Sequence, residues 1–484
     1  MRYWRLAVGY GLLAIGAAVP LAAQQQLTLK QAVELAATQG HQARAAVSTR
    51  DAARYRDRAF FSRRLPQFTL GGTVPAYNRS IVPIDQPDGT TLFRPRDQTN
   101  TSLTMTMSQQ LPVTGGSFFV QSALSQVSVS GANSFRTWSS TPISFGLRQD
   151  ILKPNVAGWD RREEIVRSEL SERQYLEARE DIATQTATAF FDVYAARVNL
   201  ETQTKNVAVN DTLYTLNKGR FEVGKIGEND LLQSELALLR SRTTLDGARL
   251  EFDRTSAALR LALNLPKNTP LDIAVTAEVP EFTADTALAV AEALRNRASV
   301  YDVTLQDVQA RRRITEARLG GGVGATIQAS YGYNATAPER RLVYQDLQEA
   351  RQFSMSVQIP LMQWGARGES VRAAEADRDR AESLGQSTMD QTAQEAHFAA
   401  LQLAQARRNL ALSAKADTVA GKRFEVALNR YVIGRIFIDN LFVAQSEKDQ
   451  ARAQFVQALR GYWQAYYRLR RLTLYDFEAG QPIR

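Results

Sequence analysis

The chain contains one stretch twice, and this duplication is the strongest constraint on its fold. Residues 220–226 run through Asp230 into a long polar helical pattern, and residues 430–436 run through Asn440 into another. The two stretches align at a constant offset of about 210 residues, so that glycine falls on glycine and leucine on leucine. A repeat of this size predicts a fold built from two related halves.

Each helical pattern that follows is a heptad with small residues at one of its positions. The apolar positions of the first copy are Leu231, Leu238, Leu245, Phe252 and Leu259, and the small ones are Ser234, Ser241, Ala248, Thr255 and Ala262. The second copy has Leu441, Lys448, Phe455, Tyr462 and Leu469, with Ala444, Ala451, Ala458 and Ala465. Such heptads predict left-handed supercoiling, and the small residues predict close approach of the backbones. Both copies are therefore expected to form antiparallel helical hairpins.

Between the helical patterns the period changes to two, which is typical of strands with unlike faces. The best-patterned alternation occurs at residues 68–74, 143–148, 325–334 and 353–359. Each strand is expected to be about ten residues long, enough to cross the apolar layer of a bilayer when tilted. Residues 75–97, rich in Pro, Asp and Gly, predict a loop.

The two faces of these strands differ in a way that suits a membrane barrel. One face is apolar, as lipid requires, and the other carries Thr, Ser, Gln or Asn, as a wet lumen requires. A soluble sheet packed on a core would show the same alternation. A further pair of strands, from Thr99 to Val129, could add to the wall or sit beyond it. Since small membrane barrels need about eight strands, closure predicts a homo-oligomer.

The N-terminus is typical of a secretory signal peptide. Arg2 and Arg5 precede an apolar run over residues 6–19, and small residues up to Ala23 form the expected cleavage site. The run is shorter than the roughly 20 residues of a spanning helix, so we interpret residues 1–23 as a cleaved signal and the rest as exported. The sequence has no cysteine, which excludes disulfides, thiolate metal sites and lipidation at cysteine.

Charge and motifs argue against catalysis and nucleic-acid binding. The net charge of +9 is spread along helical patterns, as on a solvated helix surface, and export makes a nucleic-acid partner less suitable still. His41 and His397, the two histidines, favour surface or packing roles over metal binding or proton transfer. Residues 320–324 follow a helical pattern and open a strand, so they are no dinucleotide fingerprint. We expect no enzyme activity, cofactor or metal.

Taken together, three short motifs and the doubled order resemble the TolC family of outer membrane efflux proteins. The motifs are Val223-Gly224-Lys225-Ile226 before Asp230-Leu231-Leu232, Ile433-Gly434-Arg435-Ile436, and Gln358-Ile359-Pro360-Leu361 before Trp364-Gly365. The resemblance covers essentially the whole mature chain. It implies a mainly α fold with a membrane β-barrel portion: a trimeric α-helical barrel that continues a shared outer-membrane β-barrel.

The expected organisation is two structural repeats after the signal. The first, residues 24–279, holds a helix near 30–65, strands within 67–151 and a long helical hairpin at 159–264. The second, residues 280–484, holds a helix near 286–318, strands within 325–361 and a long helical hairpin at 364–475. The order in each repeat is helix, hairpin of strands, helix, turn, helix.

The resemblance also implies a docking surface and a gate. It assigns adaptor docking at the tips to Val223, Gly224 and Lys225, and to Ile433, Gly434 and Arg435. Family members narrow the tip with acidic side chains, and Asp230 fits that role. The second copy departs from the pattern, because Asn440 stands at the matching position with Asp439 beside it. Asp230 also suits a helix N-terminus as an anion, so gate and cap both stay open.

The function that this resemblance implies is passive export. The chain is expected in the outer membrane with a large periplasmic part, as a homotrimer contacting lipid, a periplasmic adaptor and an inner membrane transporter. A proton-driven transporter of the RND type is expected, and an ABC exporter or a protein secretion system fits the same residues. The alternative is an exported periplasmic helical scaffold whose strands form a soluble sheet. A soluble periplasmic monomer would support that alternative.

Overall fold

The computed structural model describes residues 26–131, 134–276 and 278–483. The expected signal peptide, residues 1–23, lies outside them. The chain divides into two compact units. Unit 1 holds the residues up to Ala43, Ile182–Glu281 and Ala406–Gln464, and unit 2 holds Arg44–Asp181, Phe282–Gln405 and the residues from Ala465 onward.

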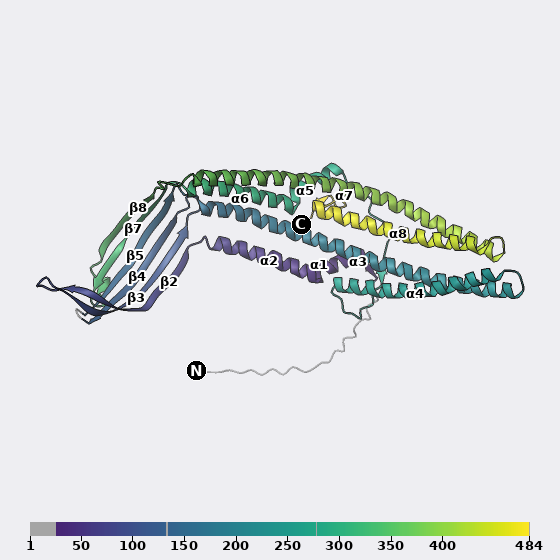
Figure 1. Ribbon diagram of the computed structural model, residues 1–484, viewed down its shortest axis with the longest axis horizontal. Helices are drawn as coiled ribbons and strands as arrows, with labels where there is room; N and C mark the ends of the chain where they lie inside the picture. The colour runs from purple at the N-terminus through teal and green to yellow at the C-terminus, as the bar shows by residue number, and fades with distance from the viewer. Residues whose placement is uncertain (1–25, 132–133, 277, 484) are drawn as a thin grey trace, which may run out of the picture. The chain divides into compact units, whose positions relative to one another are not determined.

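Helices dominate the described residues (Figure 1). The shorter helices are α1 (Leu29–Gln39), α2 (His41–Ser62), α5 (Thr286–Asn296) and α6 (Ala298–Gly320). The longer ones are α3 (Val156–Glu222), α4 (Glu228–Ala262), α7 (Ala366–Val432) and α8 (Ile438–Thr473). Both α3 and α7 have 67 residues. Within the described ranges, no helix combines the length and apolarity needed to span a bilayer.

Two helices that the sequence analysis expected to be continuous are broken. Gly40 is extended, with φ −61° and ψ 148°, and separates α1 from α2. Arg297 is extended in the same way and separates α5 from α6. The N-terminal Ala298 amide of α6 donates to the Glu177 carboxylate of α3 at 2.9 Å, so a tertiary contact satisfies the new helix end. Thr28 is the N-cap of α1 and forms a capping box with Gln31.

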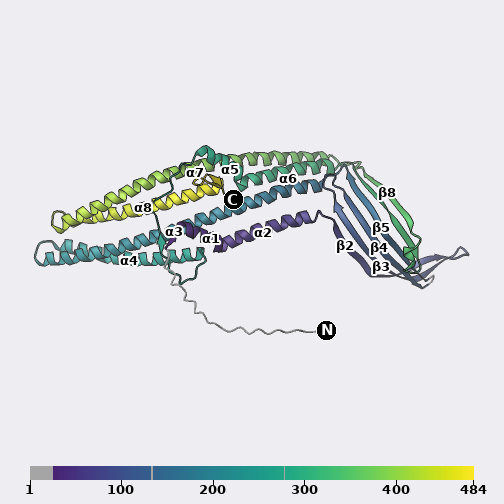
Figure 2. The same ribbon diagram turned by 180° about the vertical axis from the view of Figure 1, so that it is seen from behind.

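Unit 1 is built around the tip-side parts of two helical hairpins, α3 with α4 and α7 with α8 (Figure 2). Most heptad residues are packed, although Ala262, one of the expected small positions, is exposed. Buried positions of α4 are Ser234, Leu238, Ser241, Leu245, Ala248, Thr255, Ser256 and Leu259. In α8, Leu441 and Ala444 join Tyr431 and Leu213 in one core cluster. A short parallel pair, β1 (Leu27–Thr28) with β6 (Ile273–Ala274), completes this unit.

Unit 2 contains one antiparallel sheet of six strands. They are β2 (Gln67–Asp85), β3 (Thr91–Gln110), β4 (Ser117–Gly131), β5 (Phe135–Ile151), β7 (Gly324–Ala337) and β8 (Gln348–Gln358). The order across the sheet is β2-β3-β4-β5-β7-β8. A 3-10 turn, η1 (Leu342–Tyr344), lies between β7 and β8, and β9 (Tyr475–Asp476) pairs with β10 (Gln481–Pro482) after α8.

The strands are longer than the sequence analysis expected, and the prediction of a loop at residues 75–97 is wrong. β2 and β3 have 19 and 20 residues and pair as far as Asp85 with Thr91. The Asp85 carboxylate accepts from the Thr91 hydroxyl at 2.8 Å, and Tyr77 donates to Asp97 at 2.6 Å. Polar residues that read as a loop therefore belong to a hairpin, because they satisfy one another across it.

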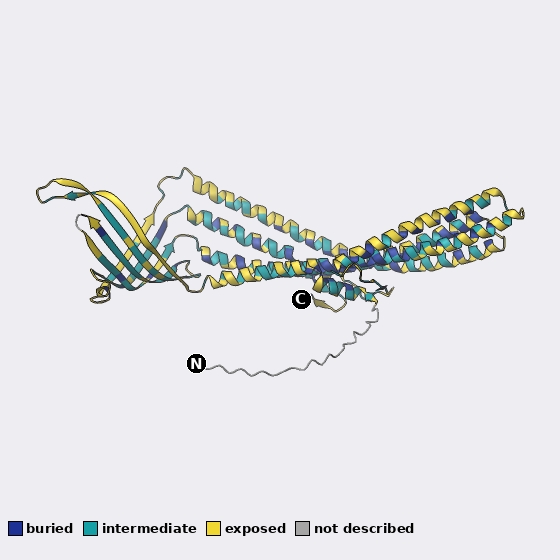
Figure 3. Cartoon of the chain, turned by 90° about the horizontal axis from the view of Figure 1, so that it is seen from below, coloured by how far each residue is buried: buried dark blue, intermediate teal, exposed yellow. Residues whose placement is uncertain are grey.

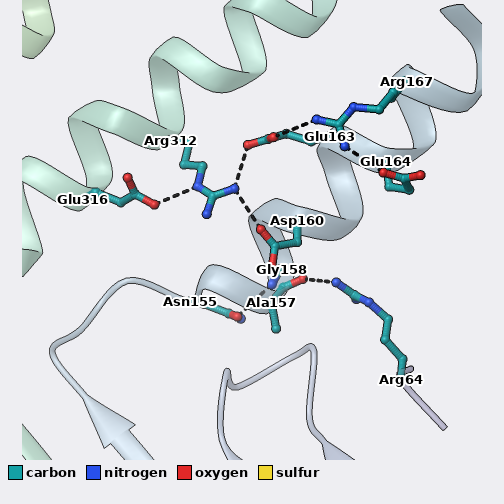
Figure 4. A network of polar contacts seen from close by, with 10 residues as sticks. All are labelled: Arg64, Asn155, Ala157, Gly158, Asp160, Glu163, Glu164, Arg167, Arg312 and Glu316. Carbon is teal, nitrogen blue, oxygen red and sulfur yellow. Dashed lines mark hydrogen bonds and ion pairs between the residues drawn. The ribbon is translucent and has the colours of Figure 1, made fainter. Parts of the chain in front are cut away.

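Polar contacts tie the sheet to the helices of unit 2 (Figure 4). Asn155 caps α3, since its side-chain oxygen accepts from the Gly158 amide at 2.8 Å, and its amide group donates to the Pro112 carbonyl at 2.9 Å in the β3–β4 turn. Arg64, which follows α2, donates to the Ala157 carbonyl at 2.7 Å. One end of the sheet is thereby fixed to the start of α3.

Arg312 of α6 is the centre of the neighbouring network. Its guanidinium contacts Asp160 at 2.8 Å and Glu163 at 2.9 Å on α3, and Glu316 at 2.7 Å on its own helix. Hydrogen bonds that Arg312 donates to the carboxylates of Glu316 and Glu163 raise the pKa of Arg312 above its ordinary value, although burial opposes the shift. Three carboxylates thus share one cation that joins α6 to α3.

We expect Arg312→Met to destabilise unit 2 by about 2 kcal/mol, because the buried Glu163 carboxylate would lose its closest cation and keep only the longer contact with Arg167 at 3.6 Å. The side chains of Arg312 and Glu163 are 22% and 10% exposed, so solvent offsets little of the loss. The measurement is the thermal unfolding midpoint of the detergent-solubilised protein. Arg318→Met is the matched control, since Arg318 lies on the same helix as Arg312 and its pair with Glu375 of α7 is 60% and 39% exposed. Equal midpoints for the two variants would contradict the assigned role.

Candidate functional site: the helical tips

Both helical hairpins of unit 1 turn at the same backbone structure. Gly224 and Gly434 have φ of +70° and +74°. The Lys225 amide donates to the Arg220 carbonyl at 2.8 Å, and the Arg435 amide donates to the Arg430 carbonyl at 2.9 Å. These bonds define Schellman motifs that end α3 and α7. Only glycine adopts such φ values without a steric penalty, which is why the duplicated stretches share it.

The residues beside these glycines are presented to solvent. Val223 is 67% exposed, Ile433 is 63% exposed and Phe437, on the second turn, is 80% exposed. Lys225 and Arg435 are exposed as well. Each tip therefore carries apolar side chains flanked by cations, a composition that suits a protein partner better than bulk water.

Contacts between the two tips involve residues that the sequence analysis did not single out. The Arg220 guanidinium donates to the carbonyl of Val432, the last residue of α7, at 2.9 Å and lies 5.4 Å from the centre of the Tyr431 ring. Tyr431 is buried and donates to the Asn217 side-chain oxygen at 2.7 Å. A cation at the carbonyl end of α7 also stabilises the helix dipole.

The pairing of the two tips is unequal, although the sequence repeats. Tyr431 is 5% exposed, whereas Phe221, its counterpart in the first copy, is 39% exposed. The difference in burial arises because the Tyr431 hydroxyl donates a hydrogen bond to Asn217 of α3, whereas Phe221 has no hydroxyl. The available signal in the sequence was this Phe-to-Tyr change between the copies, which becomes informative only when the partner on the other hairpin is known.

A groove of about 500 Å³ lies between the tips, and Asp230 is one of its lining residues. Arg220, Lys225 and Arg435 line it too, so the carboxylate shares the groove with three cations. Asp230 lies in the first turn of α4, whose N-cap Gly227 supplies no side-chain hydrogen bond. The position is compatible with a charge role at the tip and with a dipole role at the helix end.

The other two residues expected at the gate lie in the first turn of α8. Asp439 is exposed and accepts a hydrogen bond from the Gln233 side chain of α4 at 2.5 Å. Asn440 is exposed beside it. The structure thus brings Lys225, Asp230, Ile433, Gly434 and Arg435 around one groove, while Asp439 joins the two returning helices. Val223 and Gly224 lie on the exposed turn itself.

The sequence matches a model of the outer membrane efflux protein family over residues 32–265. A search of curated proteins finds no match. Solved structures match over most of the chain. The CmeC outer membrane channel of Campylobacter jejuni is 16% identical, with a TM-score of 0.66 over 94% of this chain and 87% of that chain.

Two further solved structures have the same fold. The outer membrane protein VceC of Vibrio cholerae is 16% identical, with a TM-score of 0.65 over 94% of this chain and 97% of that chain. The MtrE channel of Neisseria gonorrhoeae, solved in its open state, is 13% identical, with a TM-score of 0.63 over 92% and 88%. At such identities the structures establish the fold.

The fold is that of an outer membrane factor, with a helical barrel and a β-barrel portion. The family-model match over residues 32–265 and the shared fold confirm the resemblance to outer membrane efflux proteins that the duplicated stretches predicted. The chain is a protein of the outer membrane with a large periplasmic helical part.

Proposed function

We propose that three copies of this chain form the exit duct of a tripartite efflux system. The observation that carries the proposal is the six-stranded sheet of unit 2, in which an apolar row and a small polar row lie on opposite faces from β2 to β7. Such a sheet fits lipid outside and water inside. Channels of this family are trimeric and work with periplasmic adaptors and inner membrane pumps. The duct conducts passively, and the pump supplies the energy.

The adaptor docks at the tips. Val223, Gly224 and Lys225 form one contact surface and Ile433, Gly434 and Arg435 the other, each an exposed turn of fixed backbone shape. Fixed turns reduce the conformational entropy that docking would otherwise cost. The exposed Lys225 and Arg435 favour an adaptor tip with acidic groups. An RND pump is the expected energy source, and that pump determines which solutes are exported.

Fractionation tests the duct against an exported soluble scaffold. A duct is extracted from outer membranes only by detergent and migrates as a heat-modifiable trimer. Deleting the gene is expected to raise the cellular accumulation of the pump's substrates, and the wild-type chain restores export. A monomer in the soluble periplasmic fraction would instead support the scaffold.

Asp230 restricts the tip opening. We expect Asp230→Ala to raise single-channel conductance in planar bilayers by about two-fold, because a charged side chain at a narrow opening controls ion passage. Glu235→Ala, an exposed change further along the same helix, is the matched control and leaves conductance unchanged. If Asp230→Ala lowered the thermal midpoint without changing conductance, its role would be that of an anion at the N-terminus of α4.

A further inference from the structure

The sheet of unit 2 has two outer edges, formed by β2 and β8. Among the described strands, each of these pairs with one neighbour. The other side of each strand presents backbone amides and carbonyls that have no partner within the sheet. In a bilayer such groups cost several kcal/mol each, so an open edge does not persist there. Both edges therefore require a strand from another copy.

Burial of the apolar face points to the same conclusion. Where β3 pairs with β4, from Arg96 onward, the largest exposures on this face lie at the edges: Leu70 on β2 is 68% exposed and Phe353 on β8 is 70% exposed, against 50% for Met105 and 43% for Phe145 on inner strands. Figure 3 shows the sheet as mostly exposed or intermediate rather than buried. Side chains at the two edges have one neighbouring strand instead of two.

The strand register shows which residues share the apolar face. Phe68 on β2 pairs with Met107, Met107 with Val120, Val120 with Phe145, and Phe145 with Tyr331 on β7. Directly paired residues of an antiparallel sheet point to the same side. This row is apolar or aromatic from β2 to β7.

A neighbouring row on the opposite face is small and polar. Thr69 on β2 pairs with Thr106, Thr106 with Gln121, Gln121 with Ser144, and Ser144 with Gly332 on β7. Both rows pass through β3 and β4 without changing sides. The pair of strands between Thr99 and Val129, whose place the sequence analysis left open, thus has the same two faces as β2, β5 and β7. On β8 the apolar row ends at Arg351, which pairs with Tyr331.

Strand direction allows the two edges to meet. β2 follows α2 and β8 precedes α7, so Gln67 and Gln358 lie at the helix end of the sheet (Figure 1). The strands alternate in direction, and the order of six makes β8 of one copy antiparallel to β2 of the next. β8 has 11 residues and β2 has 19, so β8 covers the first part of β2. β4 pairs with β3 only from Arg96 onward, which leaves the outer β2–β3 hairpin beyond the wall.

We propose that the trimer closes a barrel of eighteen strands, with β3 and β4 in the wall and each seam formed by β8 of one copy and β2 of the next. The inference rests on the proposed trimer and deepens it. With strands about 4.8 Å apart and tilted by about 40°, the backbone diameter is about 36 Å. A wall without β3 and β4 would have twelve strands and a diameter of about 24 Å. Barrels of 16–18 strands hold aqueous channels, so the exit admits bulky solutes.

The first experiment locates β3 in the full-length protein reconstituted in proteoliposomes. Met105→Cys is expected to resist a water-soluble maleimide, because its side chain faces lipid. Thr104→Cys, the adjacent residue on the polar face, is expected to react through the lumen. The natural chain has no cysteine, so each label reports one site. Equal, rapid labelling of both residues would place β3 outside the wall and overturn the proposal.

The second experiment tests the seam. Ser356→Cys on β8 is combined in turn with Thr69→Cys, Gly71→Cys or Thr73→Cys, which lie on the polar face of β2. Oxidation is expected to give a covalent trimer on denaturing gels for at least one pair. The matched control combines Ser356→Cys with Thr104→Cys on the inner strand β3, which should stay monomeric. The seam would be contradicted if the control formed a covalent trimer. It would also be contradicted if none of the three β2 pairs formed one.

Counting strands by electron cryo-microscopy of trimers in nanodiscs completes the test. Eighteen strands are expected, and a trimer with twelve would overturn the inference while leaving the proposed duct intact. Recovery of soluble monomers would instead contradict the duct itself. The two failures are therefore distinguishable.

Discussion

Replacement of Gly434 by valine is expected to abolish efflux while leaving the trimer in the outer membrane. Gly434 has φ of +74°, a conformation that costs a β-branched residue about 1–3 kcal/mol. The turn would relieve this strain by moving, and the bond from the Arg435 amide to the Arg430 carbonyl would break. Since the proposed docking surface consists of that turn, small changes in its shape remove the adaptor contact. The measurement is substrate susceptibility in a strain that lacks the chromosomal gene.

The matched control for this prediction is Gly421→Val on α7, the helix that precedes the Gly434 turn. A side chain at Gly421 meets open space, and its φ lies outside the positive region. We expect this variant to restore export fully, whereas Gly434→Val resembles the empty vector and Gly224→Val behaves likewise. Equal amounts of heat-modifiable trimer must be present for all three. Full export by Gly434→Val would show that the tip turn is not the docking surface.

The second large effect is expected on stability, from Arg470→Met near the end of α8. Arg470 contacts the Glu180 carboxylate of α3 at 3.1 Å, the Asp476 carboxylate at 2.6 Å and the Tyr466 hydroxyl at 3.2 Å. The side chain of Glu180 is only 4% exposed. Removing the Arg470 guanidinium takes away the cation that faces the buried Glu180 carboxylate, which lowers the free energy of unfolding by about 3–5 kcal/mol. The thermal unfolding midpoint of detergent-solubilised protein should fall accordingly.

Arg470 stays charged over ordinary pH. Burial tends to lower the pKa of Arg470, but Glu180 and Tyr466 together outweigh burial and the net shift is upward. Because a raised pKa means that stability is lost only as pH rises through it, Arg470 keeps its charge and its contribution at any pH suitable for the protein. Burial also raises the pKa of Tyr467 to about 12, so that hydroxyl stays neutral.

Arg468→Met is the matched control for Arg470→Met. Arg468 lies on the same helix, is exposed and contacts the Gln402 side chain at 3.5 Å. Removing it should change the midpoint little, because an exposed polar contact contributes about 0–1 kcal/mol. Glu180→Gln should fall between the two, since an amide retains a hydrogen-bond acceptor for Arg470. If Arg470→Met and Arg468→Met unfolded at the same temperature, the network would not stabilise unit 2.

Local patterns predicted much of this fold correctly. The heptads of Leu238 and Leu245 became the packed seam of α4, because a seven-residue apolar period has one geometric solution along a helix. The duplicated glycines became the tip turns with positive φ. The family, the fold class and the outer membrane location are confirmed by the comparisons. The repeat boundaries and the roles of the tip and gate residues stay predictions.

Other features depended on contacts between distant residues. The helix break at Arg297 depends on the Glu177 carboxylate, which accepts from the first amide of α6. Arg220 donates to the Val432 carbonyl on the other hairpin. Tyr431 is buried because Asn217 accepts the hydrogen bond from its hydroxyl. None of these pairs lies within one local pattern. The outer part of β2 resembles a loop in sequence because its residues are polar. Only pairing with β3 gives these residues the hydrogen-bond partners that a strand needs.

The sequence by itself determined the elements whose cause is local: two heptad hairpins, two glycine turns and strands with one apolar face. These follow from periodicity and φ, which act over a few residues. Tertiary structure alone decided that β3 and β4 lie within the sheet, where Asp230 lies, and how the two tips pair. The physical reason is that hydrogen-bond partners in sheets and between helices are chosen across the whole chain, so the energy that selects them is absent from any one segment.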